Sequence, residues 1–303
     1  MNRPLLIGTR DSALALWQAN TLGEKLNDLG IDFKLVPVKS QGDLDLTQPL
    51  YSMGITGIFT KTLDIALLNK TIDIAIHSMK DVPTLLPEGI VQTAVLERGP
   101  VGDIVVWKNK EAKHKTKRVI ATGSLRRKAQ WLGLHPNDLI VDLRGNIQTR
   151  IEKLHNAAWD GAIFAEAALE RLAIENEEIE RLTNLLPAPA QGALMIVSRT
   201  EDTEIHRLLA PLNNREAAFC TQIERDFLRT LEGGCTAPIG ALAKFNGTDI
   251  DFSGGLYALN GKKKTELSTR FSAKDYQEKG TEIAKQLLAQ GGAALMNEFK
   301  SNT

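Results

Sequence analysis

One of the two cysteines in this 303-residue chain lies in a segment that has few large side chains. The segment, residues 231–240, reads LEGGCTAPIG and places Cys235 directly after Gly233 and Gly234. A cysteine thiol can act as a nucleophile, so its place among such small side chains raises the question of its role. A lone cysteine is more commonly a small buried hydrophobic residue, so the segment alone leaves both interpretations open. Cys220, in the helical pattern AAFCTQIERDF, is expected in the core.

Arginines stand at the starts of predicted helices, where local rules disfavour them. In ATGSLRRKAQW, Ser124 is a good N-cap, yet Arg126 and Arg127 follow in the first helical turn. Cations there oppose the helix dipole, at a cost of about 0.3–1 kcal/mol each. An anion bound at the helix start would reverse that effect. GTRDS shows a milder version, with Arg10 and Ser12.

A further pair of arginines flanks a predicted turn in LIVDLRGNIQTRIEKL. Arg144 is predicted to end a strand, Gly145-Asn146 turns the chain and can cap the next helix, and Arg150 lies early in that helix. Each arginine alone is most simply a solvated surface charge. Five at equivalent strand edges favour a site for carboxylates, which guanidinium groups bind bidentately. A phosphate-handling enzyme is the other reading, but the chain has no GxxxxGK[ST] or GxGxxG motif.

IDIAIHSMKDVPT adds a carboxylate to the candidate site. The buried strand is predicted to end at His77-Ser78, followed by Lys80 and Asp81. Val82 precedes a proline and must stay extended, so Asp81 is expected at the strand edge. Asp81 could simply cap a turn or pair with Lys80. Within an arginine-rich cleft it could instead act as the acid or base, or as counter-charge to a cation.

Strands alternate with helices along the first two thirds of the chain, which predicts α/β architecture with largely parallel sheets. The pattern restarts, because KRVIATGSLRRKAQWL resembles RPLLIGTRDSALALWQ, and DGAIFAEAALERL resembles DIAIHSMKD at its start. We therefore predict two similar α/β lobes with a cleft between them. After about Asn214 the pattern predicts a helix, short antiparallel strands and a helical tail, forming a small C-terminal α+β domain.

Composition excludes several classes of protein. Lys plus Arg and Asp plus Glu are 37 each, so the basic excess typical of nucleic-acid binders is absent. No apolar run reaches the length of a membrane helix, and Arg10 and Asp11 argue against a secretory signal at the N-terminus. The five histidines have no zinc-type spacing, so we expect no metal. We expect a cytoplasmic protein with Cys235 outside any disulfide.

Six motifs, in order and in register, resemble the porphobilinogen deaminase (hydroxymethylbilane synthase) family. They are GTRDSALA, HSMKDVPT, GSLRRKAQW, LRGNIQTR, LPAPAQGAL and LEGGCTAPIG. The resemblance implies an enzyme of tetrapyrrole (haem) biosynthesis that condenses four porphobilinogen molecules into hydroxymethylbilane and releases ammonia. It also implies a dipyrromethane cofactor bound to Cys235 through a thioether, and a monomer.

The family pattern also implies a fold and roles for individual residues. The lobes should resemble periplasmic binding proteins, with domain 1 at 1–98 and 194–212, domain 2 at 99–193 and domain 3 at 214–303. Asp81 would be the catalytic carboxylate. Cofactor-binding residues would be Cys235, Lys80, Asp81, Ser124, Arg126, Arg127 and Arg144. Substrate porphobilinogen would bind Arg10, Ser12, Ser78, Arg144, Arg150 and Arg171.

Two segments depart from the family pattern. ERGPVGD lacks one arginine that the family usually has, and GITGIF has Thr56 where a lysine is common. These departures put the hinge and lid contacts in doubt. The main alternative is a non-enzymatic two-lobed protein that binds or senses a small carboxylate, which would need the arginines but neither Cys235 nor Asp81.

Overall fold

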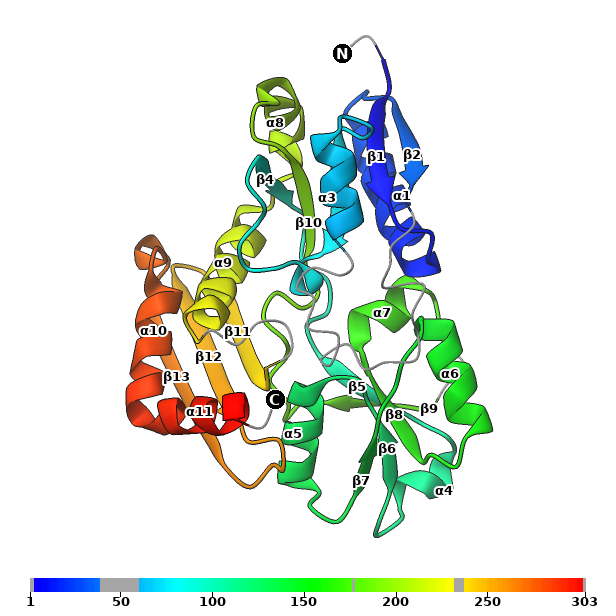
Figure 1. The fold of residues 1–303 in the computed structure, drawn as a ribbon, viewed down its shortest axis with the longest axis vertical. Coiled ribbons are helices and arrows are strands. Elements are labelled where there is room, and N and C mark those ends of the chain that lie inside the picture. The colour runs from blue at the N-terminus through cyan, green and yellow to red at the C-terminus, as the bar shows by residue number, and fades with distance from the viewer. Residues whose placement is uncertain (1–2, 39–59, 176–177, 232–236, 302–303) are drawn as a thin grey trace. The chain divides into compact units, whose positions relative to one another are not determined.

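The computed structural model describes residues 3–38, 60–175, 178–231 and 237–301. The chain divides into two compact units. Among the described residues, unit 1 comprises 3–38, 60–99 and 192–218, and unit 2 comprises the rest. The elements of both units carry the labels of Figure 1.

Unit 1 is built on a five-stranded sheet with the order β2-β1-β3-β10-β4. Strands β1 and β2 and strands β1 and β3 pair in parallel, whereas β10 is antiparallel to both of its neighbours. Its strands are β1 (Leu5–Thr9), β2 (Phe33–Pro37), β3 (Ile74–Ser78), β4 (Ile90–Val95) and β10 (Leu194–Arg199). Its helices are α1 (Ala13–Asp28), α3 (Lys61–Leu68), α8 (Thr203–Leu209) and the short 3₁₀ helices η2 (Met79–Asp81) and η3 (Ala210–Leu212).

Unit 2 contains a second five-stranded sheet of equivalent order, β7-β6-β8-β5-β9. Strands β6, β7 and β8 are parallel, and β5 is antiparallel to β8 and β9. Its strands are β5 (Asp103–Trp107), β6 (Val119–Ala121), β7 (Leu139–Val141), β8 (Gly161–Ala165) and β9 (Glu178–Leu182). Its helices are α4 (Lys110–Lys113), α5 (Leu125–Leu134), α6 (Ile147–Asn156) and α7 (Glu166–Arg171).

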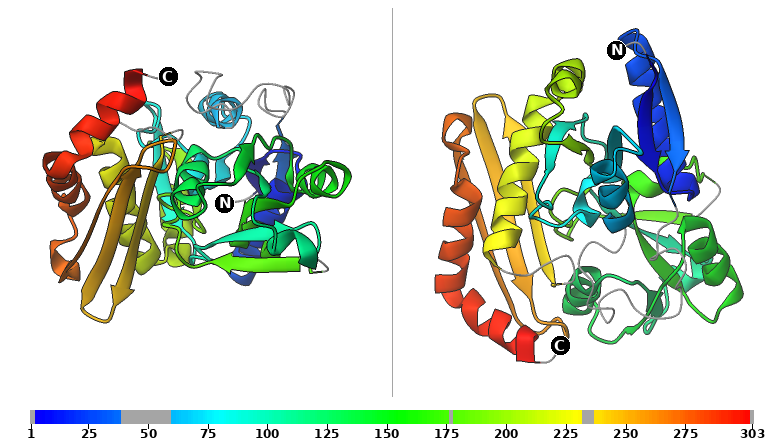
Figure 2. Two further views of the ribbon diagram at one scale, coloured as in Figure 1. Left: turned by 90° about the horizontal axis from the view of Figure 1, so that it is seen from below. Right: turned by 45° about the horizontal axis from the view of Figure 1, so that its top comes forward.

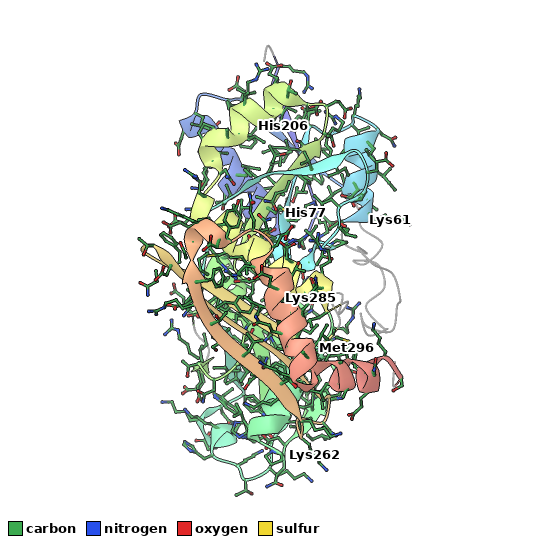
Figure 3. The ribbon with its side chains drawn as sticks, turned by 90° about the vertical axis from the view of Figure 1, so that its left-hand side faces the viewer. Lys61, His77, His206, Lys262, Lys285 and Met296 are labelled. Carbon is green, nitrogen blue, oxygen red and sulfur yellow. The ribbon has the colours of Figure 1, made fainter. Side chains whose placement is uncertain are left out.

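The C-terminal part of unit 2 is a three-stranded antiparallel sheet with helices packed against it. Its strands are β11 (Ile239–Asn246), β12 (Asp249–Tyr257) and β13 (Lys264–Ser272). One hydrophobic core joins this sheet to helices α9, α10 and α11, including Phe227, Phe252 and Met296, the last of which is labelled in Figure 3. Figure 2 shows α10 and α11 beside the sheet. The helices are α9 (Arg215–Thr230), whose first four residues belong to unit 1, η4 (Ala273–Asp275), α10 (Lys279–Leu287), η5 (Leu288–Gly292) and α11 (Ala293–Ser301).

The predicted fold class is confirmed: two similar α/β sheets and a C-terminal α+β part. The C-terminal tail is helical, as predicted, with a kink where Gln290 and Gly291 leave the helical region and Gly291 has a φ of 105°. One detail of the prediction is wrong. Strand β7 ends at Val141, three residues before Arg144, so Arg144 lies in the following loop rather than at a strand end.

Asp64 in the first turn of α3 gives a test of unit 1 stability. Burial raises the pKa of Asp64 to about 6 from an ordinary 3.8, although a hydrogen bond with Thr60 opposes the change. The folded state therefore binds the Asp64 proton more tightly than the unfolded state does. The contribution of this proton to the free energy of unfolding is lost as the pH rises through 6. We expect Asp64→Asn to raise the free energy of unfolding at pH 7.5 by about 1–3 kcal/mol.

The gain should nearly vanish near pH 3.5, where Asp64 is mostly protonated in both states. Urea unfolding at the two pH values measures it, with the exposed Asp32→Asn as the matched control. An equal effect of Asp64→Asn at both pH values would show that the ionised carboxylate costs nothing in the folded protein.

Candidate functional site

The first group of predicted site residues lies at the carboxyl ends of two neighbouring parallel strands of unit 1. Strands β1 and β3 pair through Ile7–Ile74 and Gly8–Ala75, so the residues that follow them emerge at one sheet edge. Arg10 follows β1, and Ser78 is the last residue of β3. This is the edge at which open α/β sheets bind ligands.

Local geometry at this edge follows from the sequence. Ser12 caps α1 by accepting a hydrogen bond from the Ala15 backbone N–H at 3.4 Å. Lys80 and Asp81 lie in the 3₁₀ helix η2, and Val82 is extended before Pro83, as predicted. Asp81 is exposed, so its carboxylate is accessible to a ligand.

Gln18 on α1 is a polar residue at this edge that the sequence did not single out. Its side-chain amide donates a hydrogen bond to Ser78 Oγ at 2.8 Å, although Gln18 is only 4% exposed. This contact fixes the Ser78 hydroxyl oxygen as an acceptor, so its proton is available to a ligand. A glutamine within an amphipathic helix gives no sequence signal of such a role, since most such residues face solvent.

His77 precedes Ser78 and is buried (labelled in Figure 3). Burial lowers the pKa of His77 to about 4, and the nearby Arg10 guanidinium lowers it further in the same direction. His77 is therefore neutral at physiological pH, and the positive charge at this edge comes from Arg10 and Lys80.

The second group of predicted residues lies at the carboxyl ends of the parallel strands of unit 2. The loops after β6 and β7 approach closely: a Cβ placed on Gly123 would lie 2.6 Å from the Leu143 carbonyl oxygen. The predicted residues on these loops, on the helices that follow them and on the helix after β8 are Ser124, Arg126, Arg127, Arg144, Arg150 and Arg171. The sheet order β7-β6-β8 makes their strands neighbours, which explains why distant sequence positions share one edge.

Helix caps set the entry of the two helices that bear most of these arginines. Ser124 Oγ accepts from the Arg127 backbone N–H at 3.4 Å, and Asn146 Oδ1 accepts from the Thr149 N–H at 2.9 Å. Both caps were predicted. Gly145, with a φ of 112°, allows the tight turn before α6, and its carbonyl accepts from Arg150 Nε at 2.7 Å.

Arg126 and Arg127 share one buried carboxylate, that of Asp103. Arg126 Nη1 donates to Asp103 Oδ2 at 2.7 Å, and Arg127 donates to Oδ1 through Nε at 3.0 Å and Nη2 at 2.8 Å. Gln191 Nε2 also donates to Oδ1, at 2.9 Å. The two guanidinium groups hold the pKa of Asp103 well below its usual range despite complete burial.

The expected anion at the start of α5 is therefore, in part, a side chain of the protein. Asp103 offsets the cations in the first turn of α5 that the helix dipole disfavours. Asp103 was not predicted, although its position directly before the buried strand IVVW is a signal: a carboxylate at that place needs a cationic partner.

Leu186 joins the arginine pair to the segment that leaves the second sheet. Its carbonyl accepts from Arg126 Nη1 at 2.6 Å and from Gln130 Nε2 at 3.0 Å, while its N–H donates to Gln130 Oε1 at 2.7 Å. The next residue, Pro187, accepts at its carbonyl from the Ala241 N–H on β11 at 3.0 Å. A short series of hydrogen bonds therefore connects Arg126 to the C-terminal sheet.

Arg171 ends α7, which follows β8. Burial lowers the pKa of Arg171, and Glu170 partly offsets this effect. An arginine starts from so high a pKa that the group stays cationic at neutral pH. Arg171 therefore adds positive charge to the helix that follows the third parallel strand.

Most of this chain matches two profiles of one protein family. Residues 5–207 match the profile described as "Porphobilinogen deaminase, dipyromethane cofactor binding domain", and residues 218–289 match "Porphobilinogen deaminase, C-terminal domain". The chain belongs to the porphobilinogen deaminase family. This finding supports the enzyme over the non-enzymatic carboxylate-binding alternative.

Curated porphobilinogen deaminases match the chain over its whole length. The protein of Carboxydothermus hydrogenoformans is 39% identical, with 99% of this chain and 98% of that protein covered. The protein of Chloroherpeton thalassium is 36% identical, with 100% and 99% covered. Among solved structures, an ancestral cationic amino acid solute binding protein is 15% identical with a TM-score of 0.42, covering 75% of this chain and 90% of its own.

The residue that would carry the porphobilinogen deaminase cofactor, Cys235, lies outside the described residues, as do Gly233, Gly234 and Thr56. The positions after it are described. Ala237 is buried, and the Pro238 carbonyl accepts from the Tyr257 N–H at 3.1 Å. Burial and Glu266 raise the pKa of the Tyr257 phenol above its usual range. The charge of Arg126 also acts on this phenol, in the opposite direction.

The arginine side of unit 2 fits a ligand with carboxylate arms. Arg126, Arg127 and Asp103 together carry one net positive charge, and Arg126 Nε is buried with no hydrogen-bond partner among the described residues. A buried N–H without an acceptor costs about 1–3 kcal/mol, which a bound carboxylate would recover. The described residues also include no group of three or more histidine, cysteine or acidic side chains placed to hold a metal.

Cys220 lies in the C-terminal core at 4% exposed, as expected. None of the helices within the described ranges is long and apolar enough to cross a membrane.

Proposed function

We propose that this chain is a hydroxymethylbilane synthase, a transferase that joins four porphobilinogen molecules head to tail and releases one ammonia at each addition. One water molecule completes the reaction by releasing the linear tetrapyrrole. The observation that carries the proposal is the match to both family domains, with Asp81 in the first matched range and Cys235 in the second. The reaction belongs to tetrapyrrole, and hence haem, biosynthesis.

In this proposal the arginines bind the acetate and propionate arms of the pyrrole rings. Arg126, Arg127 and Arg144 would bind cofactor carboxylates, with Lys80 and Ser124 completing the polar lining. Substrate carboxylates would bind the remaining predicted residues, Arg10, Ser12, Ser78, Arg150 and Arg171, together with Arg144. A charged hydrogen bond to a carboxylate contributes about 1.5–3 kcal/mol, so several such bonds account for the binding of one small polyanion.

Asp81 would act on the substrate as its aminomethyl carbon–nitrogen bond breaks. Ammonia leaves with the electron pair of that bond, and positive charge develops on the pyrrole nitrogen of the substrate. The exposed Asp81 carboxylate would stabilise that charge and move the proton that ammonia formation requires. Neutral His77 beside Ser78 would not add a competing positive charge at this point.

The dipyrromethane, bound to Cys235 through a thioether, would supply the primer to which the first porphobilinogen is joined. Within unit 2 the residues after Cys235 are connected to the arginine pair through Pro187 and Leu186, which supports a cofactor held by Cys235 at one end and by guanidinium groups along its length. We further propose a cytoplasmic monomer with three domains, at 1–98 with 194–212, 99–193 and 214–303.

Incubation with porphobilinogen tests the proposed reaction. We expect one ammonia released for each porphobilinogen consumed, and one hydroxymethylbilane for every four, followed by mass spectrometry of the quenched reaction. Binding of porphobilinogen without ammonia release would instead support the carboxylate-binding alternative.

A further inference from the structure

The two arginines at the start of α5 are held from the protein side by one fully buried carboxylate. Asp103 has a side chain that is 0% exposed, and it receives hydrogen bonds from both guanidinium groups at 2.7–3.0 Å. Asp103 is the first residue of β5 and lies directly after the segment that enters the second sheet. The carboxylate is therefore fixed by the backbone of the sheet and not by a mobile loop.

Neutral groups complete the support of both guanidinium groups. Arg126 Nη1 also donates to the Leu186 carbonyl, and Arg127 Nη1 donates to the Ile163 carbonyl at 3.2 Å. These bonds and Asp103 hold the two planar groups in one orientation. The Nε of Arg126 is buried and has no acceptor among the residues that the structure describes, so a ligand carboxylate could satisfy it.

The charges of the three side chains set how strongly they attract an anion. Two guanidinium groups without Asp103 would carry two positive charges, and with Asp103 they carry one. Removing a buried counter-ion would strengthen anion binding, because the ligand would replace it. The same removal would free the guanidinium planes to rotate, which would misplace whatever they bind.

Resting on the function proposed above, we propose that Asp103 is a positioning residue for the cofactor and growing chain. It acts through Arg126 and Arg127 by fixing their orientation and by cancelling one of their two charges. A polyanionic chain that must advance after each addition requires arginines that bind it without trapping it. Asp103 limits the affinity of the arginine pair for the chain by neutralising one of its two charges.

A thermodynamic cycle tests the proposal without relying on activity. The Tm is measured for four proteins: the unchanged chain and the Asp103→Asn chain, each loaded with the cofactor, and the Cys235→Ser form of each, which cannot bind the cofactor. In the Asp103→Asn chain the cofactor carboxylates replace the lost counter-ion, so we expect loading to raise its Tm by at least about 3 °C more than it raises that of the unchanged chain.

Kinetics of the loaded Asp103→Asn chain give the second readout. We expect kcat to fall about 100-fold while KM stays equal or decreases, because binding tightens as positioning is lost. The matched control is Asp138→Asn, which removes another buried aspartate of the same unit, one that pairs with Arg118 at 2.8 Å and accepts from Trp131 at 2.9 Å. We expect Asp138→Asn to lower Tm equally in both forms and to leave kcat and KM unchanged.

An Asp103→Asn chain with the same Tm difference as the unchanged chain, and normal kcat once loaded, would overturn the proposal. If that chain is too unstable to purify, Asp103→Glu carries the test, since it keeps the charge but moves the carboxylate. We expect it to show the unchanged Tm difference with a reduced kcat, and a normal kcat would refute positioning. Absence of the cofactor from the unchanged chain, seen by mass, would instead refute the proposed function.

Discussion

Replacing Cys235 by serine is expected to leave a folded chain that carries no dipyrromethane and forms no hydroxymethylbilane. The serine hydroxyl is a far weaker nucleophile than a thiol and cannot form the thioether. Intact-protein mass spectrometry measures the effect directly. The unchanged protein should be heavier than its sequence by two pyrrole units, and the additional mass should map to the peptide that contains Cys235.

Cys220→Ser is the matched control, since Cys220 is the chain's other cysteine and is buried in the C-terminal core. Placing a hydroxyl there should lower the free energy of unfolding by about 1–3 kcal/mol, while the added mass and the activity remain. The proposed attachment would be wrong if the Cys235→Ser chain kept the added mass, or if active unchanged enzyme had the bare mass of its sequence.

Periodic patterns predicted most helices and strands, because each lobe repeats the same local design. The strand, glycine, hydroxyl and helix sequence appears at β1–α1 and again at β6–α5, where Ser12 and Ser124 both cap their helices. The antiparallel strands β5 and β10 were not predicted. Each of these strands is the first that the chain forms after it leaves one unit for the other. The direction of such a strand depends on where the chain enters the sheet, and local propensity carries no information about that point.

The site was predicted less completely than the fold, and for a physical reason. The caps Ser124 and Asn146 follow from neighbours within three residues, so the sequence identifies them. Asp103, by contrast, lies far from Arg126 along the chain and meets it only through the order of β6, β8 and β5. The local rule flagged the cations in the first turn of α5 but could not identify Asp103 as the carboxylate that pairs with them.

Buried glutamines were missed for a related reason. Gln18 and Gln130 lie in amphipathic helices, and their partners, Ser78 and Leu186, are 60 and 56 residues away. The sequence gives no reason to separate them from the surface polar residues of the same helices. Gln18 contacts a predicted ligand-binding residue directly, and Gln130 shares the Leu186 carbonyl with another, Arg126. These supporting contacts therefore come from tertiary structure.

Asp81→Ala is expected to retain the cofactor yet lower kcat by roughly 100- to 10,000-fold, the range typical of a lost proton-transfer group. Alanine removes both the negative charge that stabilises the pyrrole cation and the group that moves the proton. Because Asp81 is exposed in a short 3₁₀ helix, its removal should change the free energy of unfolding by no more than about 0.5 kcal/mol. The loss of rate would therefore report chemistry rather than folding.

The distribution of bound pyrrole units shows which step Asp81 serves. After a brief exposure to porphobilinogen, the Asp81→Ala chain should hold fewer added units than the unchanged chain, as resolved by intact mass, because each addition begins with loss of ammonia. Glu88→Gln, an exposed acidic position in the following loop, should behave as the unchanged chain. A normal rate in Asp81→Ala would move the catalytic role to another group at the edge of β1 and β3.

Asp81→Glu separates the two functions of the carboxylate, since it keeps the charge at a shifted position. Partial recovery of kcat in that variant would show that charge stabilisation tolerates displacement better than proton transfer does.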